Sequence, residues 1–323
     1  MTDPAETRPA AGQPERLAPG LARILAPNPS PMTFRGTNSY LLSCGADRAV
    51  IDPGPDDPAH LAALLGALQR EGLTMILVTH AHRDHSALAP ALARATGAPV
   101  LAFGNATAGR SAVMTRLAAA APIGGGEGID AGFTPDRCLA DGEILPFGDG
   151  RIEALHTPGH MGNHLAFAWR DAIFTGDLVM GWASSLVSPP DGDLADFLRS
   201  CARLRARPET VLHPGHGPAI PDPAARIDTL LAHRHAREAQ ILDALARAPA
   251  DLSGLTARVY EGTPPALWPA AARNLLAHLV ELVRRELVLA EPALSATARF
   301  SLRQPEKSGS ARKTPLAPPG GLG

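Results

Sequence analysis

The sequence is poor in lysine, cysteine and aromatic residues. Only two of its 323 residues are lysines, Lys307 and Lys313, so arginine carries nearly all of the positive charge. Thirty basic residues against 32 acidic residues give a net charge of −2, which excludes a strongly basic nucleic-acid coat protein. The three cysteines are widely spaced and form no Cys-x-x-Cys pair, which argues against a disulfide scaffold or a cysteine zinc finger.

Long apolar runs are also missing. No stretch approaches the roughly 18 unbroken apolar residues of a membrane span. The N-terminal segment carries acidic residues and has no apolar core, so it does not resemble a signal peptide. We therefore expect a soluble, cytoplasmic protein without a membrane partner. An apolar share of 45% is enough for a sizeable core, which excludes a chain that is disordered throughout.

Composition divides the chain into four segments. Residues 1–18 and 291–323 are polar and rich in proline, and we predict that both are disordered. In residues 19–235 short apolar runs alternate with helical patterns, which predicts one α/β domain of layered sheets and helices. Residues 236–290 are mainly helical in pattern and are predicted to form a separate small module.

Apolar spacing, glycines at helix ends and Asp N-caps predict the strands and helices of these segments. Short apolar runs predict strands at residues 40–43, 49–52, 75–79, 100–103, 152–156, 165–169, 172–175 and 210–213. Helical spacing predicts helices at residues 58–72, 86–97, 193–205, 222–248, 252–260 and 266–285, followed by a short strand at 287–290. Residues 104–137 interrupt the alternation, and we interpret them as an insertion with a helix at 111–121 and a flexible loop at 124–128.

The most informative segment is residues 79–86, with the sequence THAHRDHS, directly after an apolar run. His80 and His82 lie two residues apart, so in an extended segment they can project to the same side. Asp84 and His85 fall where the next helix is predicted to start. Imidazole and carboxylate groups suit Zn²⁺, Fe or Mn²⁺, and the absence of nearby thiolates disfavours a structural zinc site. The alternative is a set of surface loop histidines.

Three later segments repeat one design, in which a potential ligand follows a predicted strand beside a glycine. They contain His160 in TPGH, Asp177 in TGD and His216 in PGHG. Glycine allows the backbone to bend and to approach closely. Strand ends that offer His or Asp at one sheet edge are what a metal site needs, whereas each of these histidines alone would be an ordinary loop residue.

Together these residues resemble the metallo-β-lactamase superfamily of binuclear hydrolases. The matching pieces occur in the family's order: VIDPG at 50–54, THAHRDH at 79–85, HTPGH at 156–160, FTGD at 174–177 and HPGHG at 213–217. The resemblance implies an αββα sandwich with two divalent metal ions at one edge of its packed sheets. Zinc is the expected metal, with Fe or Mn²⁺ as alternatives.

The resemblance also implies a ligand set. One metal would be held by His80, His82 and His160, the second by Asp84, His85 and His216, and Asp177 would bridge both. Asp52 matches a strand-end aspartate that orients the histidines from outside the ligand set. The β-lactamases of this fold usually replace His85 and carry a cysteine in place of Asp177. Antibiotic hydrolysis is therefore disfavoured, and the pattern is closer to the glyoxalase II and ribonuclease branches.

A narrower resemblance covers residues 20 to about 290. The pieces that carry it are HR at 233–234, REAQIL at 237–242, VYEGTP at 259–264 and NLLAHL at 274–279, and they resemble the β-lactamase-like protein 2 group. The resemblance implies that the C-terminal module is winged-helix-like and that the substrate is single-stranded RNA. The residues themselves do not show RNA binding, because residues 224–290 carry eight arginines against seven acids.

Three hypotheses follow for function. The first is a zinc-dependent binuclear hydrolase in which a metal-bridging hydroxide attacks a phosphodiester, as in an endoribonuclease. The second is hydrolysis of a small thioester, ester or lactone, as in glyoxalase II. The third is a non-catalytic module that binds nucleic acid or protein, against which the complete ligand set argues.

Further residues are candidates for catalysis or substrate contact. Asp84 and Asp177 are expected to act through the metals, and His164 could contact the substrate or donate a proton to the leaving group. A histidine packed against a nearby polar group is the alternative for His164. The loop 178–193, which contains Trp182, Ser184 and Ser185, is expected near the metals, with Asp193 as the N-cap of the next helix. Five histidines are expected outside the site: His156, His213, His233, His235 and His278.

Overall fold

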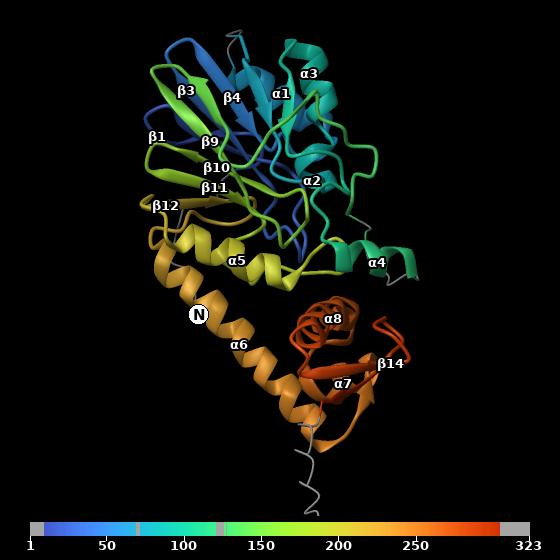
Figure 1. The fold of residues 1–323 in the computed structure, drawn as a ribbon. Coiled ribbons are helices and arrows are strands. Elements are labelled where there is room, and N and C mark those ends of the chain that lie inside the picture. Colours follow the sequence, from blue (N-terminus) through green and yellow to red (C-terminus); the bar gives the residue numbers. More distant parts are fainter. Residues whose placement is uncertain (1–9, 69–71, 121–125, 127, 304–323) are drawn as a thin grey trace, which may run out of the picture.

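A computed structural model describes residues 10–68, 72–120, 126 and 128–303. A larger and a smaller domain are joined by the long helix α6 (Pro223–Arg247), which runs from one to the other (Figure 1). Within these residues, no helix is both long and apolar enough to cross a membrane.

The first sheet of the larger domain has seven strands in sequence order. They are β1 (Pro14–Ala18), β2 (Leu21–Leu25), β3 (Asn38–Cys44), β4 (Asp47–Ile51), β5 (Met75–Leu77), β6 (Val100–Ala102) and β7 (Arg137–Cys138). Strands β1 to β4 pair antiparallel, while β4 to β7 pair parallel. In the parallel part the carboxyl ends of neighbouring strands therefore meet at one edge of the sheet.

The second sheet has five strands in the order β12-β11-β10-β9-β8. Their bounds are β8 (Ile144–Phe147), β9 (Gly150–His156), β10 (Leu165–Trp169), β11 (Ala172–Gly176) and β12 (Val211–Pro214). Strands β10 and β11 form the predicted hairpin, with Arg170 at the turn in the left-handed region at φ 55°. Since β9 and β11 are each antiparallel to β10, and β12 is parallel to β11, the carboxyl ends of β9, β11 and β12 share one edge.

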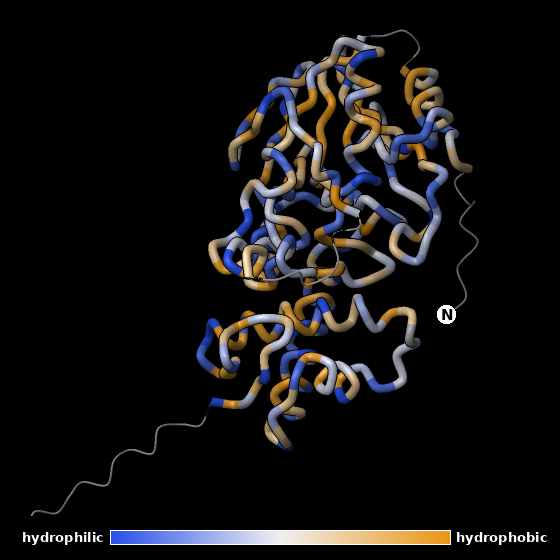
Figure 2. The backbone as a smooth tube through the Cα atoms, turned by 90° about the vertical axis from the view of Figure 1, so that its right-hand side faces the viewer, coloured by the Kyte–Doolittle hydropathy of each residue, from blue (hydrophilic) through white to orange (hydrophobic). Residues whose placement is uncertain are grey.

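Four layers result, an αββα sandwich. Tyr40 and Leu77 of the first sheet and Phe167 and Phe174 of the second are buried in a core between the two sheets. In Figure 2, apolar stretches of chain run through the middle of the larger domain, where the sheets face each other. The outer face of the first sheet is covered by α1 (Pro58–Ala67) and α3 (Ala89–Thr96), with the short α2 (Arg83–Ser86) just before α3, and that of the second by α5 (Leu194–Arg205) and α6. The expected fold class is confirmed.

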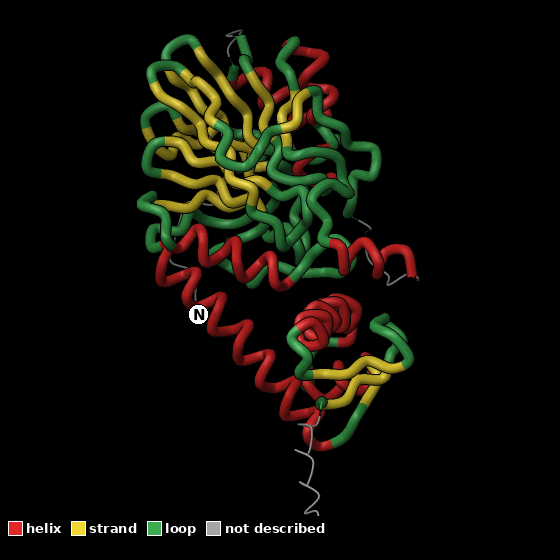
Figure 3. Tube along the Cα trace, viewed as in Figure 1, coloured by secondary structure: helices red, strands yellow, loops and turns green. Residues whose placement is uncertain are grey.

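The smaller domain combines helices with a three-stranded sheet (Figure 3). Besides the end of α6 it contains β13 (Ala250–Asp251), α7 (Leu252–Val259), η1 (Pro265–Leu267), α8 (Trp268–Arg284), β14 (Val288–Glu291) and β15 (Arg299–Leu302). Leu255, Leu275 and Phe300 are buried in its own apolar core. Met114 of α4 (Ala112–Ala120) joins that core, so residues predicted as an insertion support the second domain.

The sequence-based plan needs three corrections. The prediction of disorder over 1–18 is wrong at residues 14–18, which form the edge strand β1, and the prediction over 291–323 is wrong at residues 299–302, which form β15. The predicted boundary between residues 235 and 236 falls inside the continuous helix α6. Residues 1–9, 304–323 and most of the predicted loop 124–128 lie outside the described residues.

Candidate metal centre

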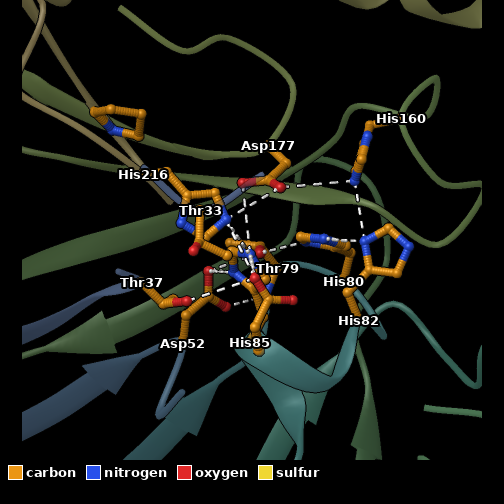
Figure 4. A network of polar contacts seen from close by, with 12 residues as sticks. Thr33, Thr37, Asp52, Thr79, His80, His82, His85, His160, Asp177 and His216 are labelled. Carbon is orange, nitrogen blue, oxygen red and sulfur yellow. Dashed lines mark hydrogen bonds and ion pairs between the residues drawn. The ribbon is translucent and has the colours of Figure 1, made fainter. Parts of the chain in front are cut away.

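The structure brings all seven predicted ligand residues to the common edge of the two sheets. Figure 4 labels His80, His82, His85, His160, Asp177 and His216 of this set. Three overlapping groups have ligand atoms within 4.8 Å of one another: His80, His82 and His160; His80, His85 and Asp177; and Asp84, His85 and His216. The first and third groups match the two sets that the family resemblance implied.

The first group consists of three imidazoles. The Nδ1 atom of His82 lies 2.9 Å from Nε2 of His80 and 3.0 Å from Nε2 of His160. His80 and His82 come from the loop after β5, whereas His160 follows β9 in the opposite sheet. The packing of the two sheets therefore brings these nitrogens together.

The set of Asp84, His85 and His216, called the second group from here on, adds a carboxylate to two imidazoles. Asp84 and His85 lie in the first turn of α2, and His216 follows β12. The Nε2 atom of His216 lies 3.2 Å from Oδ2 of Asp84 and 3.3 Å from Nε2 of His85.

Asp177 lies between the two groups, as Figure 4 shows. Its Oδ2 atom is 3.7 Å from Nε2 of His160 and 3.4 Å from Nε2 of His216, and its Oδ1 atom is 3.5 Å from Nε2 of His85. One carboxylate thus faces an imidazole of the first group and both imidazoles of the second, which is the arrangement that a bridging ligand requires.

Hydrogen bonds outside the cluster fix which ring nitrogen points inward. His160 donates from Nδ1 to the carbonyl oxygen of Leu186 at 2.8 Å, and His216 donates from Nδ1 to that of Gly36 at 3.2 Å. A carbonyl oxygen can only accept, so each Nδ1 carries the proton, and in the neutral ring each Nε2 presents a lone pair to the cluster. Partners of this kind orient metal-binding histidines in proteins generally.

Asp52 orients the ring of His85 in the same way. It is buried directly after β4, and its Oδ2 atom accepts from Nδ1 of His85 at 2.8 Å and from the Thr79 hydroxyl at 2.8 Å. Its Oδ1 atom accepts from the backbone N–H of Thr79 at 2.7 Å. One carboxylate thus ties the end of β4 to the segment that carries His80 and His82.

Gly215 illustrates why glycines accompany the ligands. A Cβ atom at this position would lie 2.6 Å from Oδ1 of Asp177 and 2.6 Å from Cε1 of His85. Both distances are far shorter than a normal contact, so any side chain at residue 215 would displace two of the predicted ligands.

The protonation states differ between the two groups. Burial lowers the pKa of His82 to about 3, helped by the nearby imidazole of His160, and holds the pKa of His80 well below its usual value. Burial would also lower the pKa of His216, but the carboxylates of Asp177 and Asp84 outweigh it and raise that pKa to about 9. Asp84, Asp177 and Asp52 likewise outweigh burial at His85 and raise its pKa well above the usual value.

We therefore expect metal binding to release protons from His85 and His216. Both are protonated at pH 7 in the metal-free protein and must become neutral to act as ligands, so affinity should rise by about tenfold per pH unit for each displaced proton below the pKa of that group. Calorimetric titrations at pH 7 in buffers of different ionisation enthalpy should report at least two protons released when both sites fill, one from each imidazole. An observed enthalpy that is the same in every buffer would contradict this assignment.

The donor set fits divalent cations. Imidazole nitrogens and carboxylate oxygens are suitable ligands for Zn²⁺, Fe and Mn²⁺. Among the described residues, Oδ1 of Asp177 is buried without a hydrogen-bond partner, as expected for an atom whose natural partner is an ion. The inward lone pair of His160 points to the same conclusion, since its Nε2 atom lies 3.0 Å from Nδ1 of His82 and a cation would relieve that close approach.

A cavity of about 300 Å³ opens over the cluster and exposes His82, Asp84, His160, Asp177 and His216. Its other described walls include the apolar side chains of Met32, Ile129, Met180 and Leu186. The loop 178–193 thus lines the site, as predicted, through Met180, Leu186, Ser188 and Asp191.

The remaining predicted residues lie outside the cavity wall. His164 is fully buried; its Nδ1 atom lies 2.9 Å from the Thr157 hydroxyl and its ring is 5.3 Å from that of His80, a placement that favours the packed alternative over substrate contact. Ser185 bonds through its hydroxyl to the Leu178 carbonyl, and Trp182 stacks on Phe34. Asp193 caps α5 by accepting from the Ala195 N–H, as predicted.

The histidines expected outside the site are placed there. His156 stacks on Phe103, and His213 packs against Tyr40 and Phe174. His233 and His235 lie on α6, and His278 lies on α8.

Sequence reasoning missed two parts of the cavity wall. Met32 and Thr33 come from the loop before β3, and Ala270 and Arg273 come from α8 in the smaller domain. Neither segment carries a ligand-like motif, and α8 reaches the cavity only because the domains dock. The helical spacing of α8 predicts its apolar faces but does not reveal which larger surface they meet.

Comparison with known proteins agrees with this geometry. The family model of the metallo-β-lactamase superfamily matches residues 32–216, more than half of the chain. The chain therefore belongs to the metallo-β-lactamase superfamily, a class of metal-binding hydrolases. A second model, the β-lactamase-associated winged helix domain, matches residues 252–295 and identifies the smaller domain.

Individual relatives place the chain more narrowly. A β-lactamase-like protein 2 homologue of Drosophila melanogaster is 32% identical over 309 residues, which cover 90% of this chain and 96% of that protein. An atrochrysone carboxyl ACP thioesterase of Aspergillus fumigatus is 29% identical over 236 residues, or 71% of this chain and 66% of that protein. A β-lactamase domain protein from Burkholderia ambifaria shares the fold, with a TM-score of 0.76 at 23% identity over 93% of this chain and 96% of that one.

Proposed function

We propose that the protein is a binuclear metal-dependent hydrolase that cleaves a small thioester or ester. The observation that carries the proposal is the cavity, in which two groups of His and Asp ligands lie beneath largely apolar walls. Two divalent cations at such a site would supply a water molecule acidic enough to act as a nucleophile near pH 7, together with positive charge for the developing oxyanion. In the reaction a C–O bond forms, the C–S or C–O ester bond breaks, and the leaving thiol or alcohol takes up a proton from water.

The chain's own residues would hold and orient the reactants. Asp177 and Asp84 supply negative charge that keeps cations at the cluster, while Asp52 and the Leu186 carbonyl fix the rings of His85 and His160. Met32, Ile129, Met180 and Leu186 offer apolar contact to an acyl chain and exclude bulk water from the cluster. We propose Zn²⁺ as the native metal, with Fe or Mn²⁺ as the alternatives to be decided by metal analysis of purified protein.

Cleavage of single-stranded RNA is the competing reaction. A protein that holds a nucleic-acid strand needs several basic side chains along a groove and aromatic surfaces for base stacking. Among the described residues that line the cavity, Arg273 is the single Lys or Arg. The relative named as a thioesterase supports the same preference for an acyl substrate.

The test is a substrate comparison with purified, metal-loaded protein. We expect turnover of short acyl thioesters or esters, none of single-stranded RNA, and loss of turnover after chelation with recovery when metal is restored. Cleavage of RNA without cleavage of any thioester or ester would contradict the proposal, and so would thioester turnover that survives complete metal removal.

A further inference from the structure

Helix α8 carries two different faces. Leu275, Leu279 and Leu282 are buried in the core of the smaller domain. Ala270, Arg273, Asn274 and Ala277 follow the i, i+3, i+4, i+7 spacing of one stripe of a helix. Ala277 of this stripe is buried in the core of the larger domain together with Phe197 and Leu230, whereas Ala270 and Arg273 line the cavity over the His/Asp cluster. The smaller domain thus supplies part of the wall of the site.

A buried arginine links helix α8 to the loop beside the His/Asp cluster. The side chain of Arg234 on α6 is almost fully buried, and it donates to Oδ1 of Asn274 at 2.6 Å and to the backbone carbonyl of Ser185. Leu186, the next residue, accepts the hydrogen bond from the predicted ligand His160. Asn274 in turn donates to the Tyr260 hydroxyl at 2.8 Å. The position of Arg273, next to Asn274, is therefore fixed relative to the metal-binding cluster.

Arg273 is half-buried in the cavity wall and has no protein partner in the described part of the chain. Its Nε atom is buried without a hydrogen bond, and the guanidinium forms no ion pair with any described residue. Asp191 lines the same cavity but is engaged by Arg110 at 2.5 Å. Partial burial of a permanently charged guanidinium costs free energy when no acceptor is present. The geometry of its N–H donors matches that of a carboxylate or a phosphate.

We propose that Arg273 binds an anionic group of the substrate, a carboxylate or a phosphate, while the scissile acyl group lies at the His/Asp cluster. The inference rests on the proposed function and sharpens it. The substrate is an acyl compound whose leaving group carries a negative charge away from the bond that is hydrolysed. The winged helix domain then serves as the specificity element of the active site.

The test uses three acyl thioesters that differ only at the end of the thiol part, which is a carboxamide, a carboxylate or a phosphate. The wild-type protein should prefer one or both anionic members. Arg273→Met should raise KM for the preferred member by about 10- to 100-fold more than it raises KM for the carboxamide, because a charge-assisted hydrogen bond to the anionic end is lost. Arg273→Lys should keep part of the preference. Arg247→Met, at the exposed end of α6 in the same domain, is the matched control and should behave like the wild type.

Binding provides a readout that does not depend on turnover. Non-hydrolysable thioether analogues of the three compounds should bind the wild type more tightly when charged, and Arg273→Met should remove that difference in calorimetric titrations. Equal binding of charged and neutral thioethers by the wild type, or a preference that Arg273→Met retains, would overturn the assignment of Arg273. Failure to hydrolyse any thioester would count instead against the proposed function, since the binding measurement decides the role of Arg273 separately.

Discussion

An Asp177→Ala protein is expected to hold at most one divalent ion and to lose at least about a thousandfold in kcat/KM. The carboxylate of Asp177 faces His160 of the first group and both His85 and His216 of the second, so its removal would take a predicted ligand from both metal sites at once. Without its charge, His85 and His216 also face each other at 3.3 Å with Asp84 as the single carboxylate beside their Nε2 atoms, while Asp52 stays on the Nδ1 side of His85.

Metal stoichiometry by elemental analysis and steady-state kinetics would measure the effect. Asp177→Asn, which keeps the shape and removes the charge, separates loss of charge from loss of packing. Asp228→Asn, an exposed carboxylate paired with Arg205 on the surface, serves as the matched control. Two bound metals with full activity in Asp177→Ala would show that the bridging assignment is wrong.

The site was more predictable from sequence than the fold around it. Each predicted ligand follows an apolar strand and stands beside a glycine or in the 79–86 segment, so local pattern and chain order were enough to predict which residues the structure brings together. The ligands meet because β5, β9, β11 and β12 end at the same edge of the sandwich. That convergence is a property of strand topology, which the apolar runs specify through alternation with helices.

Strands without an apolar signal could not be found in this way. The edge strand β1 has the sequence PERLA and no buried residue, and its place in the sheet depends on hydrogen bonds to β2. Strand β15, RFSL, has one fully buried side chain, Phe300, whose burial requires the core of the smaller domain to be assembled first. In both segments the tertiary partner decides the structure, and local composition resembles that of a disordered tail.

The contribution of α8 to the cavity could not be predicted from local sequence either. Arg273 lies between Ala272 and Asn274 in an amphipathic helix, where an arginine usually extends into solvent. Only the docking of α8 on the larger domain, through Asn274 and Arg234, brings it to the cavity. A substrate-binding residue supplied by a second domain therefore leaves no motif beside the metal ligands.

The largest effect expected from a residue outside the ligand set is at Asp52. An Asp52→Ala protein should lose about 3 kcal/mol of stability in the metal-free form, because the Thr79 N–H and hydroxyl and Nδ1–H of His85 would be left buried without an acceptor. Asp52→Asn can still accept from the Thr79 N–H, but its amide cannot accept from His85 in the same orientation. If the ring of His85 then shifts its proton to Nε2, the inward lone pair is lost, and metal affinity should fall by about 10- to 100-fold.

Denaturant unfolding with chelator present would measure the first effect, and metal titration would measure the second. Asp47→Ala is the matched control on the same strand, because Asp47 accepts from the Gly148 N–H at the exposed start of β4 and should change stability by no more than about 0.5–1 kcal/mol. An Asp52→Asn protein with unaltered metal affinity would mean that His85 is oriented by its packing among the other imidazoles. In that case the end of β4 would matter for folding and not for the metal centre.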